Sequence, residues 1–355
     1  MSVTHVPPQY PTALPAKIAF IAEAPSWDEL DKGAPLVGPS GRVFNSLLRT
    51  ANMERSDFFI GNVFDEKIPD NKIKNWCVGI KEAKATGANA YPPIGNNGYL
   101  NVSYHHQLDR LHDELVRACP TVIVPLGGTA MWAFTGKTNI SAMRGTVMKA
   151  KYILPGVKVI PTFHPRFVMQ KYQQFGVVVR DLQFALEEAN NGPEESVATR
   201  RLIIEPTLQE MWETVPHILE APLLSLDIET GWGQITSYGI SWSEEEAISI
   251  PFVDLRQPNK SYWRTPEEEF EAWKFINTVN ITSIPKLGQN FGGYDFLWIL
   301  KRMGMSVRNF REDTRLMHHA LYPELPKDLG FMGAAHSTQG AWKHMGKKGD
   351  KRDDT

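Results

Sequence analysis

The chain has 355 residues, of which 42% are hydrophobic, and a formal net charge of −2. Because a single hydrophobic core seldom serves a chain of this length, we expect at least two domains. No apolar run reaches the roughly 18 residues that cross a membrane, no secretory signal begins the chain, and two cysteines are too few for a disulfide framework or a four-cysteine metal site. We therefore expect a cytoplasmic protein with no membrane partner, which does not hold nucleic acid by charge alone.

Up to residue 192 the chain alternates between short apolar runs and helical patterns. Strands are predicted at 17–25, 57–64, 121–128 and 157–165, and helices at 41–51, 104–118, 127–136 and 178–189. This alternation predicts an α/β domain in which helices cover a parallel sheet, in an αβα arrangement, with its chemistry at the carboxyl ends of the strands. Residues 64–99 show little periodicity, and we expect a long irregular excursion there.

The boundary between domains is predicted from residues that stop a helix. The sequence Asn-Asn-Gly-Pro at 190–193 ends the last helix, and a polar segment then leads to a new apolar strand at 201–205. We therefore assign a first domain to 1–192, a linker to 193–200 and a second domain to 201–355.

The second domain opens with three apolar runs that indicate consecutive antiparallel strands, at 223–230, 234–242 and 246–252. A helix follows Thr265, and Glu268 has the spacing that completes a capping box with it. A further strand is predicted at 284–290, and helices at 294–304 and 313–321. This order of elements is typical of the opening of a ribonuclease H-like fold.

Two acidic residues lie one position apart near the end of the first of these strands. Asp227 and Glu229 share one face of the strand, about 7 Å apart, while Leu224, Leu226 and Ile228 fill the other face. Two carboxylates held this close indicate either a divalent cation between them or two solvated acids at a strand end.

Asp295 is a third acidic candidate. It falls on the first turn of the helix at 294–304, after a strand that Asn290 closes, and this position can bring it to the strand end that carries the other two acids. The alternative is an ordinary helix-start residue, because acids favour that end of the helix dipole.

These segments together resemble the proofreading 3′–5′ exonucleases of the DEDD class, as found in family A DNA polymerases. The sequence DIET at 227–230 is similar to their first motif, QNFGGYD at 289–295 to the second, and 312–331 to the segment that follows it in phage-type polymerases. The resemblance covers about residues 200 to 340.

The resemblance implies a metal site in the second domain. Asp227, Glu229 and Asp295 would bind Mg²⁺ or Mn²⁺, with Asn290 near the site, and one metal would activate water against the terminal phosphodiester. The chain departs from the family at the third motif, which supplies a base and a fourth Asp. His344 lies six residues before Asp350, which is not the family's spacing, in a lysine-rich tail that also holds Asp353 and Asp354.

The departure implies an exonuclease domain that is incomplete at its C-terminus. A site that lacks one ligand and its base is expected to bind metal weakly and to cleave poorly. The chain is then either the front part of a longer polymerase or a partner of a separate polypeptide that supplies the remainder of the polymerase.

In the first domain, candidate site residues lie before a helix and after a strand. Gly38, Ser40 and Gly41 precede or begin the helix at 41–51, where backbone amides suit a phosphate, although such glycine turns are common. His164 follows an apolar strand and precedes Pro165, a position where a histidine is also often structural.

These segments resemble the uracil-DNA glycosylase superfamily, nearest to its family 4-like and phage members. The matching motifs are AEAPSWDELDKGAPLVGPSG at 22–41, IGNV at 60–63, TVIVPLGGTAMWAFTG at 121–136 and HPR at 164–166. The resemblance covers about residues 17 to 190 and implies excision of a uracil base that has been flipped out of DNA.

The resemblance also implies roles for single residues. His164 would donate a hydrogen bond to the uracil carbonyl, Asn62 would read the uracil edge, and Glu23 would position the attacking water. Pro165 and Arg166 would press on the DNA backbone, together with the segment that holds Gly38, Ser40 and Gly41.

The chain departs from family 4 at three positions. Leu36 stands where the family has a Phe that stacks on uracil, and Ser26 replaces a glycine. Lys67 stands about where one of four cluster-binding cysteines would fall, and with two cysteines in the chain we expect no iron–sulfur cluster and no other cofactor in this domain.

The combined prediction is a phage-type DNA repair and replication protein of the host cytoplasm. It would remove uracil from single- or double-stranded DNA and would be joined to a proofreading 3′–5′ exonuclease-like domain of a family A polymerase. One alternative is a degenerate module that only binds DNA or tethers a polymerase. Another is a nuclease whose first domain only packs against the second.

Overall fold

The computed structural model describes residues 5–192 and 200–337, which belong to two compact units. Unit 1 comprises Met1–Ser196 with Asp328–Thr355, and unit 2 comprises Val197–Lys327. The predicted linker at 193–200 and the tail with His344, Asp350, Asp353 and Asp354 fall almost wholly outside the described residues. No described helix is long and apolar enough to cross a membrane.

Unit 1 is built on a five-stranded sheet in the order β2-β1-β5-β7-β6. Its strands are β1 (Ile18–Ala22), β2 (Phe59–Asn62), β5 (Val122–Pro125), β6 (Met148–Lys149) and β7 (Lys158–Val159). All neighbouring strands are parallel except β6, which runs antiparallel to β7. Every residue of β1, β2 and β5 is buried, and this explains why these strands are apolar without alternation.

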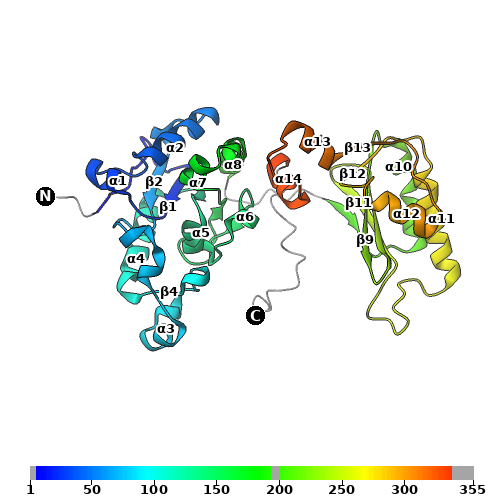
Figure 1. Ribbon diagram of the computed structural model, residues 1–355, viewed down its shortest axis with the longest axis horizontal. Coiled ribbons are helices and arrows are strands. Elements are labelled where there is room, and N and C mark those ends of the chain that lie inside the picture. The colour runs from blue at the N-terminus through cyan, green and yellow to red at the C-terminus, as the bar shows by residue number, and fades with distance from the viewer. Residues whose placement is uncertain (1–4, 193–199, 338–355) are drawn as a thin grey trace. The chain divides into compact units, whose positions relative to one another are not determined.

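Helices cover both faces of this sheet (Figure 1), and the predicted αβα arrangement is confirmed. On one face, Ile18 and Phe20 of β1 share a hydrophobic core with α2 (Pro39–Thr50) and α8 (Phe175–Asn190). On the other face, Ala19 and Ile21 pack with α4 (His105–Ala118) and α5 (Gly128–Thr135). The remaining helices of unit 1 are α1 (Trp27–Lys32), α3 (Ile80–Thr86), α6 (Ile140–Met143), α7 (Pro165–Gln170) and α14 (Leu329–His336).

The segment predicted to be an irregular excursion, 64–99, has more structure than its sequence indicated. It contains α3 and the strand β3 (Cys77–Val78), which pairs with β4 (Tyr99–Leu100). Trp76 is buried here between Phe64, at 5.2 Å between ring centres, and Tyr104, at 4.2 Å. Isolated aromatic anchors thus order a segment that has no periodic pattern. The short 3-10 helices of the chain are Arg55–Asp57, Pro69–Asn71, Ile73–Trp76, Ala88–Ala90, Gly95–Asn97, Val102–Tyr104 and Tyr172–Gln174.

Unit 2 is built on a six-stranded mixed sheet in the order β13-β12-β9-β10-β11-β8. Its strands are β8 (Arg201–Ile203), β9 (Leu224–Gly231), β10 (Gln234–Ser241), β11 (Glu246–Pro251), β12 (Lys286–Gly288) and β13 (Phe310–Asp313). The predicted antiparallel run is confirmed in β9, β10 and β11, and β12 is parallel to β9. Its helices are α9 (Leu208–Glu213), α10 (Val215–Glu220), α11 (Pro266–Asn280), α12 (Asp295–Met303) and α13 (Thr314–Leu321).

The start of α11 differs in one detail from the predicted capping box. The Thr265 hydroxyl accepts a hydrogen bond from the Glu268 backbone N–H at 3.2 Å, as predicted. The Glu268 carboxylate instead accepts from the Arg264 N–H at 2.9 Å, one residue before the cap. The helix therefore begins where the sequence placed it, but its first carboxylate satisfies a different donor.

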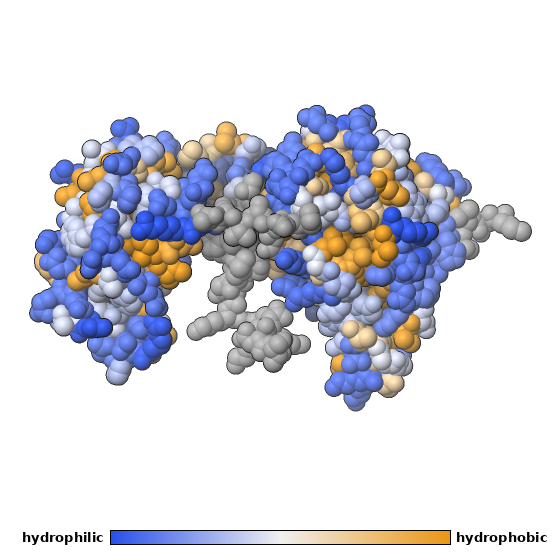
Figure 2. Space-filling view, turned by 180° about the vertical axis from the view of Figure 1, so that it is seen from behind, coloured by the Kyte–Doolittle hydropathy of each residue, from blue (hydrophilic) through white to orange (hydrophobic). Residues whose placement is uncertain are grey.

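The face of each unit that Figure 2 shows is mainly hydrophilic and carries separate hydrophobic patches. Scattered apolar side chains are usual on protein surfaces, and single exposed residues need no special explanation. In unit 2 the exposed large apolar side chains include Leu297 and Leu300 of α12 and Leu316 and Leu321 of α13.

Candidate active site

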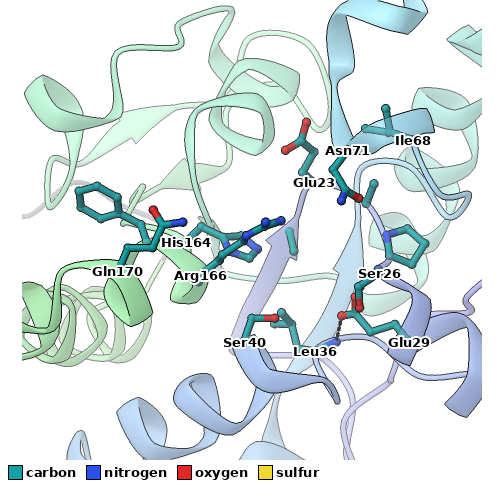
Figure 3. A pocket seen from close by; sticks show the side chains of 14 residues that line it. Glu23, Ser26, Glu29, Leu36, Ser40, Ile68, Asn71, His164, Arg166 and Gln170 are labelled. Carbon is teal, nitrogen blue, oxygen red and sulfur yellow. Dashed lines mark hydrogen bonds between the residues drawn. The ribbon is translucent and has the colours of Figure 1, made fainter.

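A pocket of about 320 Å³ lies in unit 1 beyond the carboxyl end of β1. Its walls come from residues 22–26 after β1, the Leu36–Ser40 segment, residues 68–71 and α7 (Figure 3). This is the edge of the parallel sheet at which the sequence analysis placed the chemistry. Of the predicted site residues, Glu23, Ser40, His164 and Arg166 line the pocket.

His164 enters the pocket as the residue that caps α7. Its Nδ1 accepts a hydrogen bond from the Arg166 backbone N–H at 3.0 Å. Desolvation, with a smaller effect of the Arg166 charge, lowers the pKa of His164 to about 4, so the ring is neutral at physiological pH. Because Nδ1 accepts, the single ring proton resides on Nε2. The site therefore holds a neutral N–H donor.

Glu23 directly follows β1 and lines the same pocket. Burial raises the pKa of its carboxyl group, while a hydrogen bond from Thr129 and the charge of Arg166 oppose this rise. Figure 3 shows Glu23 on one side of the pocket and His164 with Arg166 on another. A carboxylate and a neutral donor thus line one cavity, as a base or water-positioning group and a hydrogen-bond donor require.

Asn62 ends β2 and pairs in register with Ala22 of β1. It is 3% exposed, and neither its Oδ1 nor its Nδ2 has a hydrogen-bond partner among the described residues. A buried amide without partners is costly and calls for a reason such as a missing ligand. Asn62 is not among the residues that line the pocket, and lies next to it at the strand end.

Leu36 forms one wall of the pocket in a left-handed backbone conformation, with φ of +50°. Its N–H donates to Glu29, whose other carboxylate oxygen accepts from the Ser26 N–H at 2.6 Å. Its carbonyl accepts from Arg55 at 3.0 Å, and Arg55 also donates to the Pro35 carbonyl at 2.6 Å. Glu29 and Arg55 therefore hold the turn from both sides.

Neither Glu29 nor Arg55 was predicted from the sequence as a site residue. Glu29 stands three residues after Ser26, a capping-box spacing that signals a helix start. Arg55 offered no local signal, because the two carbonyls of the turn to which it donates lie about twenty residues earlier in the chain.

The predicted phosphate-binding residues surround the start of α2. A Cβ atom on Gly41 would lie 1.9 Å from the Leu36 carbonyl oxygen, so this position requires glycine for packing. Gly38 caps α2, and a Cβ there would lie 2.9 Å from the Asp28 carboxylate. Their use as phosphate donors stays a prediction.

The Pro and the Arg of the HPR motif differ in their exposure to solvent. Pro165 is buried at the first position of α7, which directs its ring away from solvent, whereas Arg166 is exposed at the pocket. Of the two, Arg166 is the residue that can meet a DNA backbone.

In unit 2 the predicted metal ligands are only partly brought together. Asp227 and Glu229 are exposed on β9, opposite the buried Leu224, Leu226 and Ile228, as the alternation predicted. Asp295 is buried, and its Oδ1 accepts from the Ile228 N–H at 3.0 Å. Burial raises the pKa of Asp295, and the charges of Glu229 and Asp313 add to the rise.

Asn290 and Asp313 complete this region. The Asn290 N–H donates to the Asp313 carboxylate at 2.9 Å, and the Asn290 side-chain oxygen accepts from Arg315 at 2.7 Å. Asp313 is buried and was not among the predicted site residues. Among the described residues, the predicted trio Asp227, Glu229 and Asp295 does not place its ligand atoms within 4.8 Å of one another. As placed, these residues do not fit a shared metal ion.

The cysteines do not fit an iron–sulfur cluster, which needs four thiolates where the chain has two cysteines. Cys77 is half-buried, and burial raises the pKa of its thiol to about 11, which keeps it protonated. Cys119 is exposed after α4.

A parallel sheet covered by helices, with a carboxylate and a neutral donor in a pocket at its strand ends, defines a class of α/β protein that binds small polar ligands there. Residues 8–183 match the uracil DNA glycosylase superfamily. The type-4 uracil-DNA glycosylase of Thermotoga maritima is 31% identical, over 44% of this chain and 68% of that protein. The chain belongs to the uracil DNA glycosylase superfamily.

Further relatives agree with this assignment. The type-4 uracil-DNA glycosylase of Archaeoglobus fulgidus is 29% identical, over 44% of this chain and 69% of that protein. That of Sulfurisphaera tokodaii is 28% identical, over 42% of this chain and 60% of that protein.

Solved structures to which the chain is weakly similar include nucleases. Trypanosoma brucei RNase D in complex with RNA U12 has a TM-score of 0.28 at 16% identity, covering 35% of this chain and 41% of that chain. The EXD2 exonuclease domain, soaked in Mn and GMP, has a TM-score of 0.26 at 14% identity, covering 38% and 68%. These TM-scores are too low to assign a fold.

Proposed function

We propose that unit 1 excises uracil from DNA by hydrolysis of the N-glycosidic bond. The observation that carries this proposal is a neutral His164 in the same pocket as Glu23. Its Nδ1 accepts from the Arg166 N–H, so the ring proton lies on Nε2, away from that contact. Membership of the glycosylase superfamily supports the same activity.

In the proposed mechanism the target nucleotide leaves the base stack and enters the pocket. As the glycosidic bond breaks, negative charge develops on the departing uracil. His164 donates a hydrogen bond to the uracil carbonyl that takes this charge, and a neutral donor does so without giving up its proton. A single donor of this kind typically contributes about 10²- to 10³-fold in rate.

Glu23 acts on the other side of the bond. In its ionised form it accepts a hydrogen bond from the attacking water and directs the oxygen to the sugar carbon, which becomes electron-poor as uracil leaves. Asn62 supplies one donor and one acceptor, a set that matches the hydrogen-bonding edge of uracil, and base binding would satisfy its buried amide.

The test is an excision assay on uracil-containing oligonucleotides in EDTA, with alkali to reveal abasic sites. We expect excision by the wild type and a loss of about 10²-fold or more in His164→Ala. No excision by folded, DNA-binding wild type would contradict the proposal and favour the DNA-binding or polymerase-tethering module.

For unit 2, Val197–Lys327, we propose a 3′–5′ exonuclease-like domain. The domain boundaries at 1–192, 193–200 and 201–355 stay a proposal, and the described helix α14 after Lys327 groups with unit 1. The supporting observation is Asp295, which bonds to β9 beside Glu229 and whose pKa is raised partly by Glu229 and Asp313. The proposed partners are DNA and the remainder of a DNA polymerase, in a phage-type repair protein of the host cytoplasm.

Trimming of a labelled 3′ end in Mn²⁺ measures this second activity, with Asp295→Asn as the control variant. We expect trimming to be slow at most, because, among the described residues, Asp227, Glu229 and Asp295 do not come together around one metal ion and because the matched motifs lack a fourth acid and a base. A rate equal in the wild type and in Asp295→Asn would assign the trimming to a contaminant.

A further inference from the structure

One rim of the unit 1 pocket carries a tryptophan that faces solvent. Trp27 begins α1 directly after Ser26, which lines the pocket, and it is 74% exposed. Single exposed apolar side chains are usual on a protein surface, but a tryptophan directly beside a binding pocket lies where it can contact a bound ligand.

A lysine accompanies this ring. The Lys67 ammonium lies 5.1 Å from the centre of the Trp27 ring and donates to the Asn71 side-chain oxygen at 2.6 Å. Asn71 lines the pocket, on the same side as Ser26 and opposite Gln170 (Figure 3). A chain of contacts therefore joins Trp27 through Lys67 to Asn71, which lines the pocket.

The opposite side, formed by α7, repeats the combination of a ring and a cation. Arg166 and Phe167 line the pocket, and the Lys171 ammonium lies 5.5 Å from the centre of the Phe167 ring. Arg166 and Lys171 are exposed. Rings and positive charges thus occur on both sides of the mouth.

This combination matches a particular form of DNA. Proteins that bind single-stranded nucleic acid stack bases on aromatic rings and place cations along the backbone, whereas a duplex keeps its bases stacked on each other. A pocket of about 320 Å³ holds one nucleobase, so the neighbouring nucleotides must lie across the rim.

We propose that the pocket mouth binds single-stranded DNA, with a base next to the target nucleotide stacked on Trp27 and phosphates at Lys67, Arg166 and Lys171. The inference rests on the proposed uracil excision and specifies its substrate form. Asp28 and Asp31 also lie on α1, and their negative charges repel phosphates. The helix therefore contributes the Trp27 ring, while Lys67, Arg166 and Lys171 make the phosphate contacts.

The first experiment measures binding of a uracil-free, fluorescein-labelled single strand by anisotropy, and so does not depend on excision. Trp27→Ala is expected to weaken binding about 5- to 100-fold, and Trp27→Phe to restore most of it. The matched control is Trp232→Ala, which removes an equally open tryptophan, 75% exposed, from the turn after β9 in unit 2.

The charge component has its own measurement. Lys67→Gln is expected to reduce the slope of log K against log[salt] by about 0.7, the value for one phosphate contact in single-stranded DNA. Unchanged single-strand binding in Trp27→Ala, or an equal loss on a duplex of the same sequence, would overturn the proposal.

Excision assays on the same variants separate this inference from the proposed function. If both hold, Trp27→Ala raises KM for single-stranded uracil DNA while kcat stays the same. If the wild type excises nothing but Trp27→Ala still loses single-strand binding, uracil excision fails and the single-strand surface stands. If Trp27→Ala excises with unchanged KM and binds as the wild type does, the surface fails and excision stands.

Discussion

At the scale of single residues, protonation decides which groups can act. In the proposed mechanism, activity requires neutral His164 and ionised Glu23. Because the pKa of His164 is lowered to about 4, its protonation removes activity only in strong acid. Because the pKa of Glu23 is raised above its ordinary value by burial, its protonation comes first as the pH falls.

This order predicts the pH profile of excision. In the wild type, kcat/KM is expected to be flat from pH 8 downward and then to fall as Glu23 is protonated. Glu23→Gln should lower kcat by about 10²- to 10⁴-fold and move the remaining acid limb down to about pH 4, where His164 titrates. A Glu23→Gln profile with an unshifted acid limb would show that another group controls it.

The buried amide of Asn62 predicts opposite effects on stability and on activity. Neither polar atom of Asn62 has a partner among the described residues, so Asn62→Leu removes unsatisfied groups at similar volume. We expect the thermal midpoint to stay the same or rise, since each such group costs about 1–3 kcal/mol, while excision falls at least tenfold. Lower stability of Asn62→Leu would mean that the amide has a structural partner.

At the scale of elements, the contact between the Leu36 turn and α2 shapes the pocket. Gly41→Ala would place a Cβ atom 1.9 Å from the Leu36 carbonyl oxygen. We expect a loss of about 1–3 kcal/mol in unfolding free energy and a higher KM, because the turn must move out of the pocket wall. Thermal unfolding and excision kinetics measure both.

Gly176→Ala is the matched control for this substitution. Gly176 also lies in a helix, α8, but a Cβ atom there would meet nothing within 4 Å. It should therefore gain up to about 1 kcal/mol from helix propensity, with unchanged KM. Similar losses in the two variants would exclude the contact with Leu36 as the cause.

At the scale of the whole molecule, the pocket belongs to one unit. Its lining residues fall between Ala22 and Gln170, within unit 1. A fragment of residues 1–192 is therefore expected to retain excision. Its thermal midpoint should fall, because the fragment lacks α14, whose Phe331 ring lies 5.6 Å from the Arg144 guanidinium. A folded fragment without excision would show that residues after 192, either α14 or unit 2, contribute to the reaction.

Long periodic elements were predictable from the sequence, whereas short elements were not. The strands at β1, β2 and β5 and the helices α2, α4, α5 and α8 follow from apolar runs and helical spacing, both of which are local. Short elements such as α6 and β6, and the ordered segment around Trp76, depend on contacts rather than on periodicity.

Local sequence patterns were sufficient to predict which chemical groups stand at the ends of strands. His164 and Glu23 follow apolar runs, and the carboxyl ends of parallel strands meet at one edge, so their meeting was predictable. In unit 2 the alternation of Leu224, Leu226 and Ile228 with two acids determined which face of β9 the acids occupy.

The positions and charges of these groups, in contrast, depend on the folded chain. The proton position on His164, the burial of Asp295 against β9, and the hold of Glu29 and Arg55 on Leu36 depend on atoms brought together by folding. Desolvation and hydrogen bonding are properties of a packed environment, and a residue's neighbours along the chain do not determine that environment.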